Sequence, residues 1–319
     1  MTARNGRTLG AEVKEYLMHR RSLGFGLVLN EVVLRDFVRF AAAAGHRGPL
    51  ITDFMLRWAT SNAQHSSSYQ AERLSVVRGF ARHLAARDGE SEVPDQRLLA
   101  SRFRRGRPHV YSEQQLRQLI ESAAAFPSAD PLRAVGYATL FGLLASTGMR
   151  VSEPLALRFD DVDLDRGVLR VLETKFRKSR LVPLHPTVIK AMRRYVVERN
   201  RDPRRRSSNW FFLGRGDERL PHRSVHHAFR RICSLLGWRG NGDRPLPRIH
   251  DLRHGFAIRR LLTWYREGVD VEQAIASLST YLGHGKVTDT YWYLTGTPEL
   301  LAAAGSRFER FTAPARRSP

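Results

Sequence analysis

The sequence contains one cysteine, Cys233, among its 319 residues. A single thiol cannot close an internal disulfide, so a disulfide-stapled extracellular fold is excluded and a reducing compartment is favoured. No apolar run reaches the roughly 18 residues of a membrane span, and no signal-peptide pattern opens the chain. We therefore expect a soluble, cytoplasmic protein without membrane contact, in which Cys233 is a small buried side chain rather than a nucleophile.

Acidic residues are also scarce, with 31 Asp and Glu against 53 Lys and Arg. The formal net charge is +22 and the sequence pI about 11.2, and arginine greatly outnumbers lysine. Because guanidinium groups bind phosphates in a bidentate manner, this excess predicts a polyanionic partner, most simply nucleic acid. An acidic membrane surface is the alternative, but no basic amphipathic helix or lipidation motif supports it.

The chain is long enough for two domains. Residues 1–100 show apolar residues three and four positions apart in four stretches, which predicts a small four-helix domain. Gly45 and Gly89 stand where helix C-terminal caps belong, and Ser67 with Gln70 has the spacing of a capping box. The four stretches are 11–25, 30–45, 51–62 and 68–89.

A basic segment, 101–110, lacks periodicity and carries Gly106 and Pro108, which indicates a linker. Its arginines either are solvated or lie on a DNA backbone between two domains that hold a duplex, and we favour the second interpretation. Residues 1–100 hold 14 basic and 10 acidic side chains, so a charge of +18 remains for the rest of the chain, where we expect the main phosphate site. The linker arginines are Arg102, Arg104, Arg105 and Arg107.

Residues 111–319 are predicted to form a second, larger domain. It opens with a capping box from Ser112 to Gln115, followed by a nearly all-apolar helix that ends at Gly148 and a short helix from about Ser152. The alternating stretch "GVLRVLETKFRKSRLVPL" predicts a β-hairpin, and helical patterns return beyond residue 186. The expected fold is therefore mainly α-helical with a small β-sheet.

Several side chains in this region are suited to phosphate chemistry. Arg150, in "TGMRVSE", lies so close to an apolar helix that it needs an anionic partner, either a ligand or Glu153. His250 and Arg253, in "HDLRH", share one face if the segment is helical. His250 and His254 also have the spacing of a zinc-binding helix, but Asp251 stands where that motif has glutamate and no third ligand follows, so a zinc hydrolase is disfavoured.

The tip of the predicted hairpin carries four cations, which would repel one another in isolation and bind well to phosphates. They are Lys175, Arg177, Lys178 and Arg180.

Near the C-terminus, "LGHGKVTDTYWYLTG" holds His284 and two tyrosines. Since a helix turns about 100° per residue, Tyr291 and Tyr293 would point to nearly opposite sides, and at most one faces a given site.

The ordered set of Arg150, Lys175 in a hairpin ending "RLVPL", "HDLRH", "LGH", and a tyrosine nine residues after His284 resembles the tyrosine recombinase, or phage integrase, family. The resemblance spans nearly the whole chain, and the ending "TYWYLTGTPELL" is most similar to integrases of transposons and other mobile elements. It implies a helical core-binding domain at 1–100, a catalytic domain at 111–319, and a tail from about 294 that docks on a neighbouring protomer or on its own domain.

The resemblance also implies roles for six residues. Tyr293 would attack the scissile phosphate and form a 3′-phosphotyrosyl bond, while Arg150 and Arg253 hold the non-bridging oxygens. Lys175 would protonate the leaving 5′ oxygen, with Lys178 as its competitor because Phe176 replaces the glycine often found after that lysine. His250 would assist proton movement at the tyrosine, and His284 would donate a hydrogen bond to the phosphate.

No metal, ATP or other cofactor is expected. The partners implied are double-stranded DNA and further copies of the chain, as a homotetramer with a dimer at each site, with or without accessory recombinases. A type IB topoisomerase and a catalytically inactive DNA-binding protein remain as alternatives.

Overall fold

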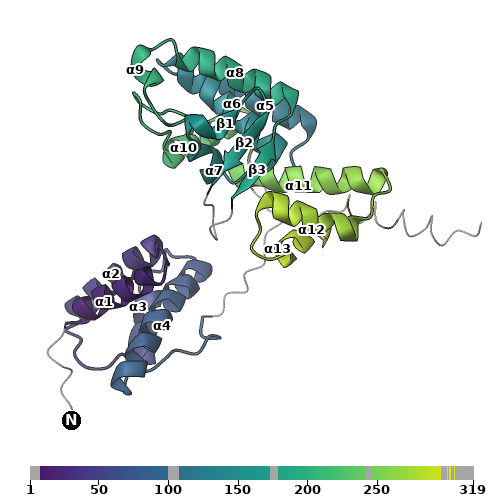
Figure 1. Ribbon diagram of the computed structural model, residues 1–319. Coiled ribbons are helices and arrows are strands. Elements are labelled where there is room, and N and C mark those ends of the chain that lie inside the picture. The colour runs from purple at the N-terminus through teal and green to yellow at the C-terminus, as the bar shows by residue number, and fades with distance from the viewer. Residues whose placement is uncertain are drawn as a thin grey trace, which may run out of the picture. The chain divides into compact units, whose positions relative to one another are not determined.

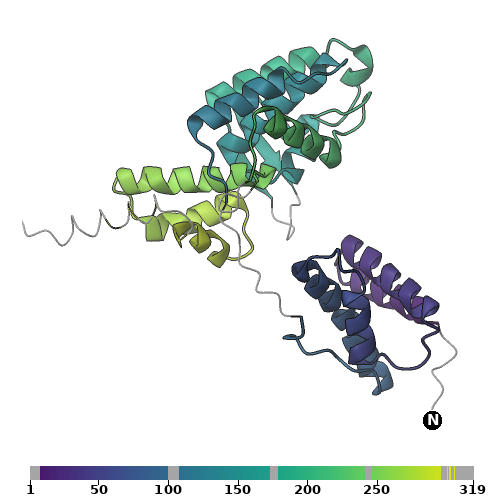
Figure 2. The ribbon, with the colours of Figure 1, turned by 180° about the vertical axis from the view of Figure 1, so that it is seen from behind.

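The computed structural model describes residues 8–99, 108–172, 179–240 and 246–295, together with residues 300, 302 and 305. The chain divides into two compact units, Met1–Arg105 and Gly106–Pro319, drawn from two sides in Figures 1 and 2. In the described ranges, no helix combines the length and apolar character needed to cross a membrane.

In the described part of the first unit, residues 8–99, the chain forms four helices, in the stretches where the apolar spacing predicts them. Its helices enclose their own core, in which Phe37, Phe54, Trp58 and Phe80 are buried among aliphatic side chains. Trp58 packs edge-on against Phe37, with 5.0 Å between the ring centroids. The helices are α1 (Leu9–Ser22), α2 (Val28–Ala43), α3 (Thr52–Thr60) and α4 (Ser67–Asp88).

For α4, the predicted C-terminal cap is confirmed and the predicted N-terminal cap is wrong. Gly89 is the C-cap of α4 with φ of 65°, a left-handed conformation that glycine adopts without steric cost. The predicted capping box from Ser67 to Gln70 is wrong by one residue, because Ser66 is the N-cap and its hydroxyl accepts from the backbone N–H of Tyr69.

The second unit is helical around a small sheet. The capping box of Ser112 and Gln115 is confirmed in both directions, and Gly148 ends the long apolar helix with φ of 63°. In order, the helices are α5 (Glu113–Ala124), α6 (Pro131–Thr147), α7 (Ser152–Leu155), the 3₁₀ helix η1 (Phe159–Asp161), α8 (Pro186–Arg199), α9 (Pro203–Arg206), α10 (His222–Leu235), α11 (Ile249–Arg266), α12 (Val271–Leu282), α13 (Thr288–Tyr291) and the 3₁₀ helix η2 (Trp292–Thr295).

The sheet has three antiparallel strands in the order β1 (Val162–Asp163), β2 (Val168–Val171) and β3 (Arg180–Pro183). The pairing of β2 with β3 confirms the predicted hairpin, with Leu169 opposite Val182 and Val171 opposite Arg180. β1 was not predicted, since two residues are too few for a visible alternation. Leu169, Val171 and Val182 turn inward and join the core formed by the helices.

Two hydrophobic cores hold the second unit. The larger lies between the sheet and helices α5, α6, α8 and α10, and it includes the buried Cys233, whose thiol pKa burial raises to about 12. The smaller joins α11 and α12 to the C-terminal segment through Leu261, Leu278, Tyr293 and Leu300. α11 packs against both α6 and α12 and so connects the two cores (Figure 1).

Candidate active site

Arg150 lies in the short loop between α6 and α7. The loop begins at Gly148, where a Cβ atom would come within 2.5 Å of the Phe256 ring, so both the left-handed φ and the close packing require glycine. The Arg150 backbone N–H donates to Oε2 of Glu153 at 2.9 Å, and its Nη1 donates to Oε1 at 3.2 Å. The sequence alternative of an internal ion pair with Glu153 is therefore present in the protein without DNA.

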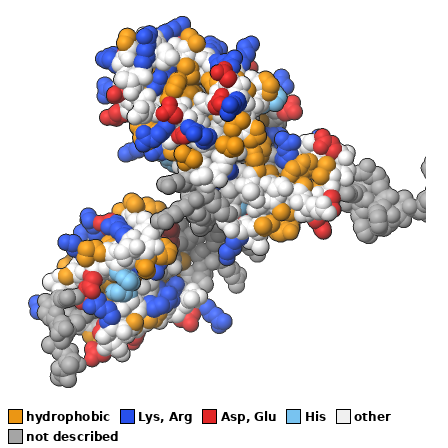
Figure 3. All heavy atoms as spheres, viewed as in Figure 1, with side chains coloured by type: hydrophobic (Ala, Val, Ile, Leu, Met, Phe, Trp, Pro, Cys, Tyr) orange, Lys and Arg blue, Asp and Glu red, His pale blue; other side chains and the backbone are white. Residues whose placement is uncertain are grey.

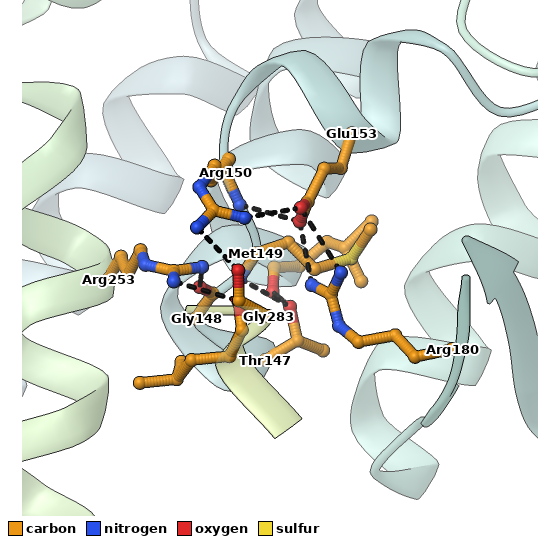
Figure 4. A network of polar contacts seen from close by, with 10 residues as sticks. Thr147, Gly148, Met149, Arg150, Glu153, Arg180, Arg253 and Gly283 are labelled. Atoms are coloured by element: carbon orange, nitrogen blue, oxygen red, sulfur yellow. Dashed lines mark hydrogen bonds and ion pairs between the residues drawn. The ribbon is translucent and has the colours of Figure 1, made fainter. Parts of the chain in front are cut away.

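Glu153 also binds a second arginine. Arg180, at the start of β3, donates Nη1 and Nη2 to the two oxygens of the same carboxylate, at 3.1 and 2.8 Å (Figure 4). The exposed fractions of the side chains are 4% for Glu153, 12% for Arg180 and 21% for Arg150. Burial raises the pKa of Glu153, but the hydrogen bonds and charges of Arg180 and Arg150 lower it further, so the net shift is downward.

Arg253, on α11, is buried and joins the ends of two helices. Its Nη1 donates to the carbonyl of Gly148 at 2.9 Å and its Nη2 to the carbonyl of Leu282 at 2.8 Å. Arg150 donates its Nη2 to the next carbonyl, that of Gly283, at 2.7 Å. Both guanidinium groups therefore lie at the C-terminal ends of α6 and α12, where the helix dipoles favour positive charge (Figure 4).

The charges of this cluster act on one another. Burial, together with the charge of Arg150, lowers the pKa of Arg253 to about 10, while Tyr293 and Glu153 act in the opposite direction. The carboxylate of Glu153 pairs with both Arg150 and Arg180, whereas Arg253 donates to backbone carbonyls. The positive charge of this group therefore exceeds its negative charge. Such a site is suited to an anion with several oxygen acceptors.

Tyr293 lies on η2 and is buried, with 2% of its surface exposed, whereas Tyr291 is 47% exposed. The Tyr293 hydroxyl lies 3.1 Å from Nδ1 of His254. The charge of an ionised Tyr293 would raise the pKa of Arg253, so the phenol lies close enough to Arg253 to interact with it. The two tyrosines thus point into different surroundings, as a helical segment predicts, and Tyr293 is the one beside the histidines and arginines.

His250 lies one turn before His254 on α11, and the two rings pack edge-on with centroids 4.6 Å apart. Desolvation by the surrounding protein and the charge of Arg253 lower the pKa of His250, although Asp251 opposes the shift. The His250 side chain is nevertheless exposed to solvent. Across the described ranges, no three or more His, Cys, Asp or Glu side chains are grouped to hold a metal.

His284 follows Gly283, the left-handed C-cap of α12, and lies near the phenol. Its ring is roughly parallel to that of Tyr293, with 6.2 Å between the centroids. Nδ1 of His284 lies 2.6 Å from the hydroxyl of the buried Thr290, on α13. This contact fixes the orientation of the ring, so its other nitrogen has a defined direction.

The described structure brings together five of the six residues singled out as catalytic from the sequence, namely Arg150, His250, Arg253, His284 and Tyr293. The sixth, Lys175, lies outside the described residues, as do Arg177, Lys178 and the linker cations Arg102, Arg104, Arg105 and Arg107. Arg180, expected to contact DNA phosphate, is instead paired with Glu153 in the protein without DNA.

Sequence reasoning missed two members of this cluster. His254 was considered only as a zinc ligand, yet its position four residues after His250 places both rings on one helical face. Thr290 gave no signal beyond its place between His284 and Tyr293.

A further cationic group, which the sequence analysis did not single out, lines a cavity of about 470 Å³ along α10. Its residues are Arg223, His226, His227, Arg230 and Arg231.

Comparison with known proteins places this chain in a family. Residues 109–299 match the phage integrase family. A Sinorhizobium fredii protein described as integrase/recombinase y4rB is 39% identical over 307 residues, which cover 95% of this chain and 98% of that protein. The tyrosine recombinase XerD of Caulobacter vibrioides is 30% identical over 240 residues, covering 74% of this chain and 73% of XerD.

Two solved structures share the fold. The integrase of the transposon Tn1549, in complex with transposon right end DNA, has a TM-score of 0.68 at 15% identity, with 96% of this chain and all of that chain covered. The XerH site-specific recombinase bound to a palindromic difH substrate has a TM-score of 0.65 at 18% identity, with coverages of 89% and 80%. At these identities the likeness concerns the fold alone. Since the family match spans most of the second unit and relatives align along almost the entire sequence, this chain belongs to the phage integrase family and is a tyrosine recombinase.

Proposed function

We propose that this protein is a site-specific recombinase of a mobile element, which cleaves and rejoins DNA strands through a 3′-phosphotyrosyl bond to Tyr293. The observation that carries the proposal is the convergence of Arg150, Arg253 and the Tyr293 phenol in one partly buried cationic cluster. The integrase and transposon names among its relatives and structural neighbours support the mobile-element assignment.

In this proposal the two guanidinium groups bind the non-bridging oxygens of the scissile phosphate. Without DNA they donate to the carbonyls of Gly283, Leu282 and Gly148, so these carbonyls hold the donors in place before the substrate arrives. A phosphate would take over part of this donor set, and the fixed positive charge would stabilise the extra negative charge of the pentavalent transition state. Arg150 is the more exposed of the two and would meet the phosphate first.

The remaining residues would move protons. Lys175 would protonate the 5′ oxygen as it leaves, His284 would donate a hydrogen bond to the phosphate from the nitrogen not held by Thr290, and His250 would assist proton movement at the tyrosine. The phosphotyrosyl bond retains the energy of the phosphodiester, so strand joining needs no ATP. With guanidinium and ammonium groups supplying the positive field, we expect the reaction to proceed in the presence of EDTA.

We further propose double-stranded DNA as the partner, bound by cationic surfaces of both units. Lys and Arg side chains are spread over the face of each unit that Figure 3 shows. The α10 group (Arg223, His226, His227, Arg230 and Arg231) lines a cavity and would contact the DNA backbone. The cations of the hairpin tip and linker would add further contacts, and a homotetramer with a dimer at each site would exchange the strands.

The experiment is to incubate the purified protein with duplexes from the ends of its element, in EDTA and without ATP. A nick one nucleotide from the cleavage position would let the released fragment diffuse away, so a covalent protein–DNA adduct accumulates and can be resolved on a denaturing gel. Sequencing the adduct would define the cleavage position and the 3′ linkage.

Two outcomes would change the proposal. Relaxation of any supercoiled plasmid without Holliday junctions would indicate a topoisomerase. Specific DNA binding without an adduct under any condition would indicate a DNA-binding protein with an inactive site.

A further inference from the structure

The Tyr293 hydroxyl has a specific partner that none of the six assigned roles includes. Nδ1 of His254 lies 3.1 Å from this oxygen, which is hydrogen-bond distance, and the ring centroids are 5.4 Å apart. His254 is on α11, directly after Arg253, and Tyr293 is on η2, so the contact joins two elements that are distant in the sequence. A buried phenol and an imidazole in this geometry form a proton donor and acceptor pair.

The surroundings of the pair fix both rings. His250 packs edge-on against His254 from the preceding turn of α11, and His284 lies roughly parallel to the Tyr293 ring. The Tyr293 ring belongs to the hydrophobic core that joins α11 and α12. The titratable and charged groups around the contact are therefore His250, Arg253 and His284, which come from α11 and from the end of α12.

We infer that His254 is a catalytic residue, whose Nδ1 takes the proton of the Tyr293 hydroxyl as the phenol attacks the phosphate. The inference rests on the proposed function. In the cleavage step the Oη–P bond forms, the bond from phosphorus to the 5′ oxygen breaks, the phenol proton passes to Nδ1, and the leaving oxygen takes a proton from Lys175. In the rejoining step the 5′-hydroxyl attacks phosphorus and gives its proton to Lys175, the Oη–P bond breaks, and His254 returns its proton to the phenol oxygen.

This assignment gives the two histidines of "HDLRH" different roles, according to what each one contacts. His250 contacts the ring of His254 and is under the charge of Arg253, which disfavours a second positive charge on it. His254 is the one in hydrogen-bond contact with the nucleophile. His250 would then hold the His254 ring in place rather than take the phenol proton itself.

The test compares His254→Asn, His254→Ala and wild type in single-turnover cleavage of the nicked duplex. Asparagine places an amide atom near the position of Nδ1 and can keep a hydrogen bond, but it cannot take up a proton. Loss of a positioned base reduces such a rate about 100-fold or more, so both variants should be slower by that factor at pH 7. His19→Asn, on the exposed surface of α1, is the matched control and should cleave like wild type.

Two further readouts separate proton transfer from structural support. A phenol with a pKa near 10 ionises without help as the pH rises, so the deficit of His254→Asn should shrink steadily between pH 7 and 9. A duplex with a 5′-bridging sulfur has a leaving group that needs no proton, so it should restore cleavage to a Lys175→Ala variant and not to His254→Asn.

The outcomes are distinct. Equal rates for His254→Asn and wild type would overturn the inference, as would a deficit that is constant with pH or is removed by the sulfur substrate. If wild type itself gives no adduct, the proposed function fails instead. Thermal unfolding and DNA affinity are measured for each variant, and His254→Asn decides the case if His254→Ala does not fold.

Discussion

Arg180 and Glu153 form a two-point ion pair, in which both terminal nitrogens of the guanidinium donate to the two oxygens of one buried carboxylate. The same carboxylate holds the backbone and side chain of Arg150. Glu153 therefore links a strand of the sheet to the loop that carries a proposed phosphate ligand. Through Glu153, Arg180 of β3 therefore helps to position Arg150, although the two arginines are 30 residues apart in the sequence.

The first prediction concerns the charge of Glu153. Replacing it with glutamine leaves two partly buried guanidinium groups without their counter-charge, which should lower the free energy of unfolding by about 3 kcal/mol. Urea denaturation of Glu153→Gln against wild type measures the loss. Glu121→Gln, on the surface of α5, serves as the control for a glutamate outside the network, and an equal effect in both variants would contradict the role given to Glu153.

The second prediction is how the difference in unfolding free energy between wild type and Glu153→Gln depends on pH. The pKa of Glu153 in the folded protein is lowered from its ordinary value of 4.5, so the unfolded chain takes up the proton first as the pH falls. The stability from Glu153 should therefore be fully present above about pH 4.5 and decline below it, towards the folded pKa. Denaturation of wild type and Glu153→Gln from pH 7 to pH 3 should give free energies of unfolding that converge as the pH falls. A difference between the two proteins that grows in acid would contradict this prediction.

The third prediction separates backbone strain from packing at Gly148. Alanine at this position must adopt φ of 63° and also displace Phe256, because its Cβ would lie 2.5 Å from the ring. Gly237→Ala is the matched control, since φ is 68° and no atom lies within 4 Å of the added Cβ. We expect a loss of about 1 kcal/mol for Gly237→Ala and about 3 kcal/mol for Gly148→Ala.

Only the Gly148 substitution should reduce DNA cleavage, because only it moves the loop of Arg150. Comparable cleavage by the two variants would show that the loop tolerates the shift.

The fourth prediction concerns the orientation of His284. Thr290→Val keeps the shape of the side chain but removes the hydroxyl that lies 2.6 Å from Nδ1. The ring then loses its fixed direction, and single-turnover cleavage should fall about tenfold, less than the roughly 100-fold expected for removal of a catalytic proton donor. Thr290→Ser keeps the hydroxyl and should retain most of the rate, so a serine variant as slow as the valine variant would argue against this role.

The fifth prediction tests the nucleophile. Tyr293→Phe should form no covalent adduct and should bind DNA with unchanged affinity, whereas Tyr291→Phe should form adducts at the wild-type rate. Losing the hydrogen bond to His254 should also cost Tyr293→Phe about 1 kcal/mol of stability. Denaturing gels and binding titrations of the two variants in parallel provide the measurement, and adducts that persist without the Tyr293 hydroxyl would assign the reaction to another residue.

Periodicity and capping signals predicted the parts of the fold that depend on neighbouring residues. The helices around Leu140 and Val225, the end of α6 at Gly148 and the pairing of β2 with β3 all follow from local patterns. β1 was missed because it has two residues, and the start of α4 was assigned one residue late because Ser66, Ser67 and Ser68 are chemically equivalent caps.

The site was less accessible to sequence reasoning, since its contacts join distant segments. The i, i+4 spacing of His250 and His254 puts both rings on one face, and only the packing of η2 against α11 brings one of them to Tyr293. Likewise, nothing local distinguishes Arg180 from the other hairpin cations. Its pairing with Glu153 depends on how the strand lies beside the loop after α6.

The burial of Thr290 limits the reach of the nucleophile. Three residues of chain, at no more than about 3.6 Å each, let the Cα of residue 293 swing at most about 11 Å from that anchor. Leu300, packed with α11 and α12, anchors the segment on its far side as well. While both contacts hold, Tyr293 stays beside His254 of its own chain, and a larger displacement of its phenol would require α13 to detach.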